Sequence, residues 1–592
     1  MRGERLILCG GAGAPKGRTP ALRLQLDPRS RERNIDLKLS DISKKLVKNL
    51  PDSLIDLIEL ATYVYCADQM FSRGGDLSRG EGTDWRRALR FVVPARCPDQ
   101  WSSAPVSEAL RNTLGFLSDE EFAFEFCRLP SPVPVTEYFD FGPDEGQGAK
   151  VEDVLLFSGG LDSLAGVVRE AVVGKRRVAL VSHRSTSKTA GYREELVAEV
   201  GRLCRGRPPY HIPVWAHKVG LKSRENTQRT RTFLYASLAT AVARLYGLNR
   251  IRFYENGITS LNLPITAQLI GSRASRSTHP QTLRLFSRLF TLIMGHDFSV
   301  ENPGFWHTKA ELVDEIGEAG AARLINRTRS CHHTQDSTIL HTHCGRCSQC
   351  LTRRFATLAS KHASEDHKDK YKSDPLISPT KKGPDQALAE GFPRTALEIE
   401  AMSASEFCVR YGELKEALDA LEGADDKNSR RVFDLHLRHS RQVLAAIARV
   451  IGDHASRISR RKLAPSSVVG MVLYAGAAAA PSTRGKETSE IEYFHPSSDY
   501  RTILYKGNEL SVRPAASRIL QVMHEEFVLT RVPTVSASVL AQATCLEGDL
   551  LGHLRHCRSI WRIIVGPGGK GKVRFLVLPS PDSREMVFRS EA

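Results

Sequence analysis

The stretch "LLFSGGLDSLAGVV" at 155–168 restricts the fold more than any other part of the chain. The apolar run Val154–Phe157 predicts a short buried strand, and Asp162 or Ser163 is a candidate N-cap of a helix over 164–173. The glycines between them allow a sharp turn and a close approach to a ligand. Such a unit aims several backbone N–H groups at one point, which favours a phosphate. The alternative is an ordinary connection between a strand and a helix.

A second local pattern is a cluster of cysteines. Cys331 is followed by Cys344, Cys347 and Cys350, the last three at CxxCxxC spacing. Four thiolates close a tetrahedral zinc site of the structural type. The alternatives are an iron–sulfur cluster, a chance grouping of reduced thiols, or a ligand set in which a nearby histidine replaces a cysteine: His332, His333, His341 or His343.

Length, charge and hydropathy limit the classes of protein. At 592 residues the chain is long enough for more than one domain. Its net charge of +17 suits anionic partners such as ATP and nucleic acid, although a basic solvated surface gives the same number. No apolar run has the length of a membrane span, and the apolar part of the N-terminus is too short for a secretion signal. We therefore expect a cytoplasmic protein with reduced cysteines and no membrane partner.

The motif SGGxDS resembles the PP-loop of the N-type ATP pyrophosphatases. Followed by "SC…CGxCxxCxxR", it resembles the 7-cyano-7-deazaguanine synthase (QueC) family over about residues 150–360. "RTRTFLYASLATAVA", with Arg229 ahead of a helix over 231–243, is similar to a helix of that family. "NPGFWHTKAELV" (302–313) places Lys309 on the family's lysine, a candidate pyrophosphate ligand. A QueC-like protein is thus the expected identity of this part of the chain.

The alternation of apolar strands and helices over 151–360 predicts an α/β fold with a doubly wound parallel sheet. The resemblance implies that ATP, with Mg²⁺, is cleaved to AMP and pyrophosphate by an ATP-dependent carbon–nitrogen ligase. The implied catalytic residues are Asp162, Ser163 and Lys309. The implied ATP ligands are Ser158, Gly159, Gly160, Leu161, Asp162, Ser163, Arg229 and His183. His183 ends a predicted strand, and a plain core or edge histidine is the alternative there.

The chain departs from the family near the substrate. The segment "YPDCR" is absent, and "SRASRSTHP" (272–280) stands in its place. Arg273 and Arg276 are candidates for binding a substrate carboxylate, since a guanidinium can bind both oxygens, or they lie on a solvated loop. The extra length resembles that of QueC-like proteins of bacterial antiviral operons, the Qat and type IV CBASS systems. That likeness implies activation of a 7-deazaguanine carboxylate and its transfer to ammonia or to an amine of a partner protein from the same operon.

Composition suggests the following division: a flexible tail (1–35), an α+β extension (36–150), the PP-loop domain (151–360) with a zinc knuckle at 331–350, a linker (361–390), a helical segment (391–476), a second linker (477–496) and a winged-helix-like domain (497–580). In the last, Arg555, Arg558 and Arg562 would lie on a recognition helix, with Lys570 and Lys572 on the wing. Such a stripe can contact DNA or belong to a protein-interaction module.

Two other functions remain open from the sequence alone. One is a PP-loop enzyme that thiolates tRNA, a chemistry that usually needs redox-active cysteines or an open cluster site. The other is a nucleic-acid-binding scaffold with an inactive PP-loop. The closed set of four cysteines argues against the first, and the complete SGGLDS motif argues against the second.

Overall fold

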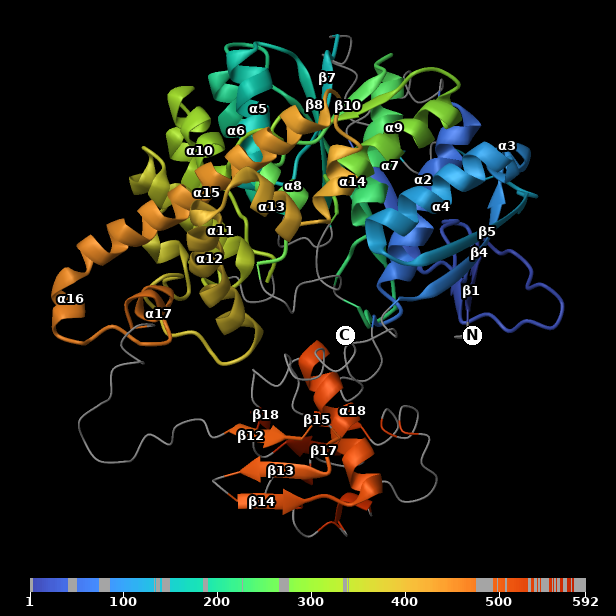
Figure 1. The fold of residues 1–592 in the computed structure, drawn as a ribbon. Coiled ribbons are helices and arrows are strands. Elements are labelled where there is room, and N and C mark those ends of the chain that lie inside the picture. Colours follow the sequence, from blue (N-terminus) through green and yellow to red (C-terminus); the bar gives the residue numbers. More distant parts are fainter. Residues whose placement is uncertain are drawn as a thin grey trace. The chain divides into compact units, whose positions relative to one another are not determined.

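The computed structural model describes residues 4–40, 50–73, 86–132, 134, 139–140, 150–184, 190–225, 227–265, 276–333, 338, 340–474, 493–497, 499–505, 508–530, 534–536 and short stretches between 540 and 579. The chain divides into two compact units, Met1–Ala477 and Ala478–Ala592. Figure 1 labels many of the elements of both. Among the described helices, none has the combination of length and apolar character that crossing a membrane requires.

The first unit is built on a seven-stranded sheet of order β11-β10-β7-β8-β9-β3-β6. Its strands from β11 to β9 run parallel, and β3 is antiparallel to β9. The strands are β3 (Ile35–Ser40), β6 (Phe139–Asp140), β7 (Asp153–Leu156), β8 (Val178–Arg184), β9 (Tyr210–Lys218), β10 (Arg250–Arg252) and β11 (Ser299–Glu301). The predicted α/β class with a parallel sheet is confirmed.

Helices cover both faces of this sheet. Alternate residues of a strand point to opposite faces, so Val154 and Leu156 belong to one core, while Leu155 and Phe157 belong to another. The first core contains α7 (Arg231–Leu245) and α9 (Pro280–Met294). The second contains α5 (Leu161–Val167), its π-helical continuation Val168–Val173, α6 (Ala190–Leu203), α10 (Lys309–Glu318) and the 3₁₀ turn Ala322–Arg327. The short helix α8 (Gly257–Leu261) follows β10.

The prediction of a flexible tail over 1–35 is wrong. β1 (Arg5–Cys9) is a buried strand of a second, parallel sheet of order β2-β1-β4-β5, whose other strands are β2 (Leu22–Leu24), β4 (Ala88–Ala95) and β5 (Glu121–Arg128). The apolar run "LILC" is long enough for a strand once β4 pairs with it. Helices α2 (Asp52–Asp68), α3 (Pro98–Ser102) and α4 (Ala104–Ser118) join this sheet to the core that contains α7.

The predicted linker 361–390 is also wrong, because it is packed against helices. Asp366 within it is 3% exposed and forms ion pairs with Arg353 and Arg354 of α11 (Ser348–Ala359). Two 3₁₀ turns, Ala363–Glu365 and Lys368–Lys370, lead into α12 (Pro384–Ala401). The segment is thus fixed to the protein despite its charged sequence, because its buried carboxylate forms ion pairs with the two guanidinium groups.

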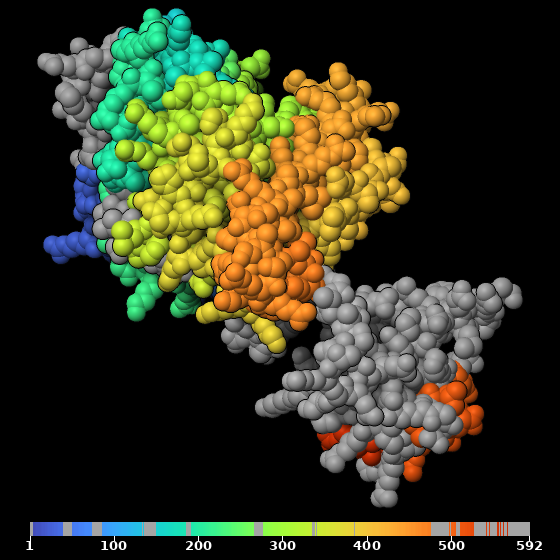
Figure 2. Space-filling model, turned by 90° about the vertical axis from the view of Figure 1, so that its left-hand side faces the viewer, coloured from blue at the N-terminus to red at the C-terminus, as the bar shows by residue number. Residues whose placement is uncertain are grey.

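The helical segment then continues through α13 (Ala404–Arg410), α14 (Leu414–Leu418), α15 (Asp425–Asp453), α16 (Ala455–Ser459) and α17 (Val468–Tyr474). The long helix α15 packs against α11, α12 and α13. Figure 2 shows the yellow to orange segments of this part side by side on one face of the first unit. The helical segment is thus joined to the α/β part by α11.

The second unit contains two small sheets and helix α18 (Pro514–Thr530). One sheet has the order β14-β13-β12-β18, from Asn508–Ser511, Thr502–Tyr505, Tyr493–Pro496 and Leu578–Pro579. The other has the order β15-β17-β16, from Thr534–Ser536, Lys572–Phe575 and Val565–Pro567. β16 and β17 pair antiparallel. Arg558, Arg562 and Lys570 lie outside the described residues, so a winged helix remains a prediction.

Candidate functional site

The loop after β7 has the backbone that its glycines predict. Gly159 has a φ of +80°, and a Cβ on it would lie 2.8 Å from the ring of Tyr192, so this position requires glycine. The N-cap of α5 is Gly160 and has no side-chain cap. The prediction that Asp162 or Ser163 caps the helix is therefore wrong. Both side chains lie in the first turn of α5, where they line a cavity.

Asp162 is held by residues from two other parallel-sheet connections. The ammonium group of Lys309, the first residue of α10, donates a hydrogen bond to its carboxylate, and Asn256 Nδ2 donates another at 3.1 Å. A capping box between Thr308 and Glu311 fixes the start of α10. The predicted catalytic pair Asp162 and Lys309 is thus brought together by the fold.

Glu255 is a third ionisable residue at this point, and the sequence analysis missed it. Burial, and then the charge of Asp162, raise the pKa of its carboxyl group to about 8. A hydrogen bond joins the carboxyl groups of Glu255 and Asp162. The signal was available, because "ENG" (255–257) follows β10 after Phe253 and Tyr254, at the carboxyl edge of a parallel sheet, where ligands bind.

These residues line one cavity of about 530 Å³. Besides Asp162, Ser163, Lys309 and Glu255, its lining includes three guanidinium groups, those of Arg193, Arg231 and Arg329. Ser158 and Gly160 contribute from the loop, and the two serine hydroxyls, Ser158 Oγ and Ser163 Oγ, lie 3.1 Å apart. Cationic side chains and a glycine loop on one cavity favour a polyanionic ligand.

The arginines are positioned by neighbouring aromatic and loop groups. Arg193 Nε donates to the Ser158 carbonyl at 2.9 Å, and the Arg329 guanidinium lies 4.3 Å from the ring centroid of Tyr192. The Arg329 backbone N–H donates to the Gly159 carbonyl at 3.0 Å, which ties the segment before the cysteines to the loop. Arg231 donates to the Tyr235 hydroxyl at 2.6 and 3.0 Å. Among the described residues, Arg231 has no carboxylate partner in an ion pair.

Three of the predicted ligands lie elsewhere. His183 is buried between the rings of Tyr65 and Tyr235, and its Nε2 is 2.8 Å from the Ala216 carbonyl. It shares a face of β8 with the core residue Val181, which is why it points into the core and does not line the cavity. The alternative of a core histidine is the right one.

Arg229 and Arg276 do not line the cavity either. Arg229 donates to the Ser118 carbonyl at 3.0 Å, and burial lowers its pKa to about 10. Arg276 donates to the Phe116 carbonyl at 3.1 Å and covers the Phe116 ring. Arg273 lies outside the described residues. The sequence analysis missed all three cavity arginines, and one of them, Arg231, is two positions from the predicted Arg229.

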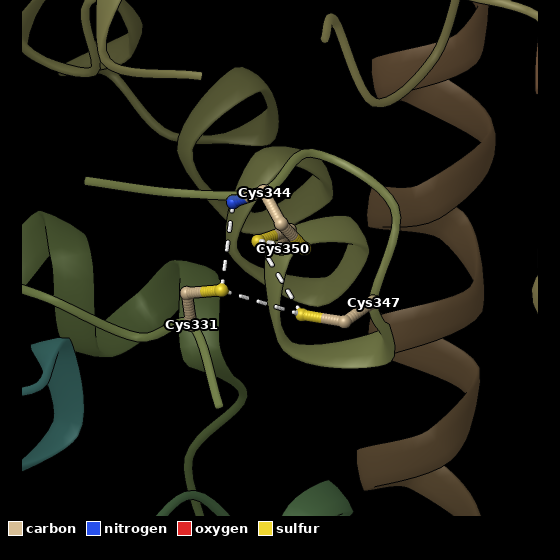
Figure 3. Close-up of side chains that lie close together, drawn as sticks. All are labelled: Cys331, Cys344, Cys347 and Cys350. Carbon is tan, nitrogen blue, oxygen red and sulfur yellow. Dashed lines mark hydrogen bonds between the residues drawn. The ribbon is translucent and has the colours of Figure 1, made fainter. Parts of the chain in front are cut away.

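The four cysteines converge as predicted (Figure 3). Their sulfur atoms all lie within 4.8 Å of one another, with Sγ···Sγ distances of 3.4 Å for Cys347–Cys350, 3.8 Å for Cys344–Cys350 and 3.9 Å for Cys331–Cys347. A tetrahedron with Zn–S bonds of about 2.3 Å has edges of about 3.8 Å, so the set fits a zinc ion. The donor set contains no histidine; His343, for example, packs on Tyr371.

The cysteine cluster borders the loop cavity. Cys331 and its neighbour His332 are among the residues that line it. The segment that carries them is fixed by Arg353, which donates to the Thr328 hydroxyl at 2.6 Å, the Ile325 carbonyl at 2.8 Å and Asp366 at 2.9 Å. A metal at the cysteines would therefore hold one wall of the cavity in place.

A comparison with protein families found a match over the segment that carries Lys309 and the four cysteines. Residues 276–360 match the family model of the "Queuosine biosynthesis protein QueC". The matched range contains Lys309 and all four cysteines but ends before the helical segment and begins after the glycine loop. Among curated proteins, no match to the chain was found. The matched segment supports a QueC-like relationship and an ATP-utilising enzyme of the PP-loop type.

Proposed function

We propose that the chain is an ATP-dependent ligase that adenylates a 7-deazaguanine carboxylate and transfers the acyl group to an amine. The observation that carries this proposal is the single cavity that gathers the glycine loop, Asp162, Lys309 and three arginines. The QueC match over 276–360 supports the PP-loop chemistry. The particular acid is suggested by the resemblance to the synthase family.

Two steps make up the proposed reaction. A carboxylate oxygen of the acid attacks the α-phosphorus of ATP, and the bond to the bridging oxygen breaks, releasing pyrophosphate. An amine nitrogen then attacks the acyl carbon of the adenylate, loses a proton, and displaces AMP. Ser158, Ser163 and the backbone of the loop would hold the pyrophosphate oxygens, and Lys309 and the arginines would stabilise their charge.

The residues present also fit a divalent cation. Asp162 and Glu255 offer two carboxylates within hydrogen-bonding reach on one cavity wall, and oxygen donors are what Mg²⁺ prefers. Together they would hold the ion, which supplies charge neutralisation for the phosphates when bound. Displacement of the proton shared by the two carboxyl groups would accompany this binding.

The zinc proposed at Cys331, Cys344, Cys347 and Cys350 is structural, because four thiolates leave no open coordination position. It supplies no chemistry to the reaction. Its contribution would be to fix Cys331 and the preceding Arg329 beside the glycine loop.

The acceptor is either ammonia or an amine of a partner protein, and a role in bacterial antiviral defence rests on the likeness of the long form to proteins of such operons. DNA contact through the second unit would be a separate activity. Of its proposed basic residues, Arg555 and Lys572 are described, and Arg555 lies over the Trp561 ring.

Pyrophosphate exchange tests the activation step directly. The purified chain, with MgATP and 7-carboxy-7-deazaguanine, should incorporate labelled pyrophosphate into ATP only when the acid is present. Formation of ADP and phosphate, or exchange independent of the acid, would refute the assignment. Two mass measurements then separate the acceptors. An added acyl mass on a co-expressed operon partner supports a protein amine, and a free primary amide of the acid among the small-molecule products supports ammonia.

A further inference from the structure

A second chamber of about 590 Å³ adjoins the loop cavity. It lies among α8, the start of α11, and helices α12 and α15, which pack against each other. His332 and Gln349 line both hollows, so the two share a wall. A ligand long enough to occupy both would have to pass these two side chains.

Much of this chamber is built from a part of the chain that the QueC model does not match. The matched residues end at 360, whereas α12 supplies Leu388, Phe392 and Ile399, and α15 supplies His436 and His439. The helical segment thus has a role in the site that the family resemblance does not assign. In Figure 1 it is drawn in yellow and orange.

The size and the walls of the chamber suit an organic ring. The lining combines polar groups with apolar and aromatic side chains, among them Ile258, Leu263, Phe392, Tyr411 and Val443. Its volume falls within the range of about 300–1,000 Å³ that is usual for ligand pockets. A molecule the size of water or ammonia occupies only about 30 Å³ in a liquid, so the chamber is far larger than such a ligand needs.

The polar groups of the chamber require a donor from the ligand. His436 Nδ1 lies 2.8 Å from the Val432 carbonyl, and because a carbonyl only accepts, this assigns the hydrogen to Nδ1. Burial lowers the pKa of His436 to about 4, so the ring is neutral and Nε2 is an acceptor. Among the described residues this buried Nε2 has no hydrogen-bond partner. A buried acceptor without a partner is costly, and an N–H of a ligand would satisfy it.

His439 is a second imidazole on the chamber wall. Burial, followed by the charges of His436 and Lys309, lowers its pKa to about 3. His439 is therefore neutral, like His436. Since Asp385 also belongs to the lining, the chamber disfavours an anionic ligand portion and suits N–H donors.

The loop cavity and the chamber differ in the charged side chains that line them. The described lining of the chamber contains no lysine or arginine, whereas the loop cavity contains Lys309 and three arginines. A ligand with one anionic end and one uncharged ring would therefore place the anion in the loop cavity and the ring in the chamber.

We propose that the chamber binds the uncharged, N–H-bearing ring of a heteroaromatic carboxylic acid whose carboxylate reaches the loop cavity past His332 and Gln349. This inference rests on the proposed adenylating function and deepens it. It assigns recognition of the acid to α12 and α15, in place of Arg276, which contacts Phe116.

Filling the chamber tests the proposal. Leu388→Trp places a larger side chain on the α12 wall, and Leu397→Trp is its matched control on the same helix, at an exposed position outside the chamber. In pyrophosphate exchange with 7-carboxy-7-deazaguanine, Leu388→Trp should raise the KM of the acid at least about tenfold and leave the KM of ATP within about twofold. The control should behave as the unaltered protein.

A second variant tests whether a rise in the KM of the acid could come from misfolding. His436→Phe keeps a flat ring against Phe407 and removes the Nε2 acceptor, so the KM of the acid should again rise about tenfold at an unchanged melting temperature. An unchanged KM of the acid in both variants would overturn the chamber assignment, as would a rise in the KM of the amine alone. Absence of acid-dependent exchange in the unaltered protein would refute the proposed activity, and the inference with it.

Discussion

The ammonium group of Lys309 donates to the carboxylate of Asp162 across 147 residues of sequence. Both side chains are less than a tenth exposed. This pair joins the start of α10 to the glycine loop, so the two QueC-like motifs recognised separately in the sequence form one electrostatic unit. Removal of either charge would leave the other buried without its partner.

The first prediction concerns this unit. Asp162→Asn keeps the shape of the side chain but removes the charge that faces Lys309, and Ser158→Ala removes a loop hydroxyl. Each should lower acid-dependent formation of AMP at least about 100-fold, as loss of one preorganised polar group in an active site does. Quantifying AMP by chromatography measures the effect, with circular dichroism to check folding.

Asp434→Asn, at an exposed position of α15, is the control and should retain full activity. Accumulation of ADP instead of AMP in any of these proteins would contradict the proposed cleavage at the α-phosphorus.

The second prediction distinguishes two neighbouring arginines. Arg231 lines the loop cavity, whereas Arg229 donates to the Ser118 carbonyl. Arg231→Gln should therefore lower kcat/KM about 10- to 100-fold, because it removes a charge-assisted contact to an anionic ligand. Arg229→Gln should mainly lower the melting temperature. Equal losses of kcat/KM in the two variants would show that the cavity does not distinguish them.

The third prediction concerns the metal. Cys344→Ser should release zinc and lower the melting temperature by at least about 5 °C, since metal binding contributes to folding. Cys408→Ser is the control, because Cys408 lies outside the cluster. Elemental analysis of the unaltered protein should give one zinc per chain. Iron with a visible absorption band would instead indicate an iron–sulfur cluster.

The fourth prediction is a pH dependence. Burial opposes ionisation of Asp366, but the charges of Arg353 and Arg354 outweigh it and lower the pKa of this carboxyl group to about 2. Because the folded pKa lies below the unfolded one, the stabilisation is complete above about pH 4 and is lost as pH falls from about 4 towards 2. Asp366→Asn should cost about 3–5 kcal/mol at neutral pH, since it leaves two buried guanidinium groups without their anion.

Thermal unfolding at a series of pH values measures this. The difference in melting temperature between the unaltered protein and Asp366→Asn should shrink below pH 4. Asp369→Asn, three residues away and exposed, should follow the unaltered protein throughout. A difference in melting temperature that does not change with pH would mean that the charge of Asp366 does not stabilise this segment.

Short motifs indicated several residues that the fold brings together, and long-range packing decided the remainder. The glycine loop and the cysteine spacing indicated Asp162 and the four cysteines, and the family resemblance indicated Lys309. Arg231 was missed in favour of Arg229 because the two lie on either side of the start of α7: Arg231 is its first residue, whereas Arg229 precedes the N-cap and contacts Ser118. Glu255 was missed because its partner, Asp162, is distant in the chain.

The wrong predictions have the same kind of physical cause, namely contacts between segments that are distant in the sequence. β1 is too short to be recognised as a strand from its sequence, and its pairing with β4 is what stabilises it. The segment around Asp366 has the composition of a solvated loop, but ion pairs with two buried arginines fix it in place. His183 was placed in the cavity because it ends a strand, but alternation along β8 turns it into the core. The helices α12 and α15 were recognised as helices, yet nothing local indicates that they line a chamber.

Cys331 belongs at once to the metal-binding cluster and to the wall of the loop cavity. Two ligands that share a residue do not bind independently, and the free energy that couples them is reciprocal. If zinc tightens nucleotide binding by a given factor, then the nucleotide must retain zinc more tightly by the same factor. In that case the nucleotide-bound protein would resist chelators most, and nucleotide-free protein would be the first to lose zinc.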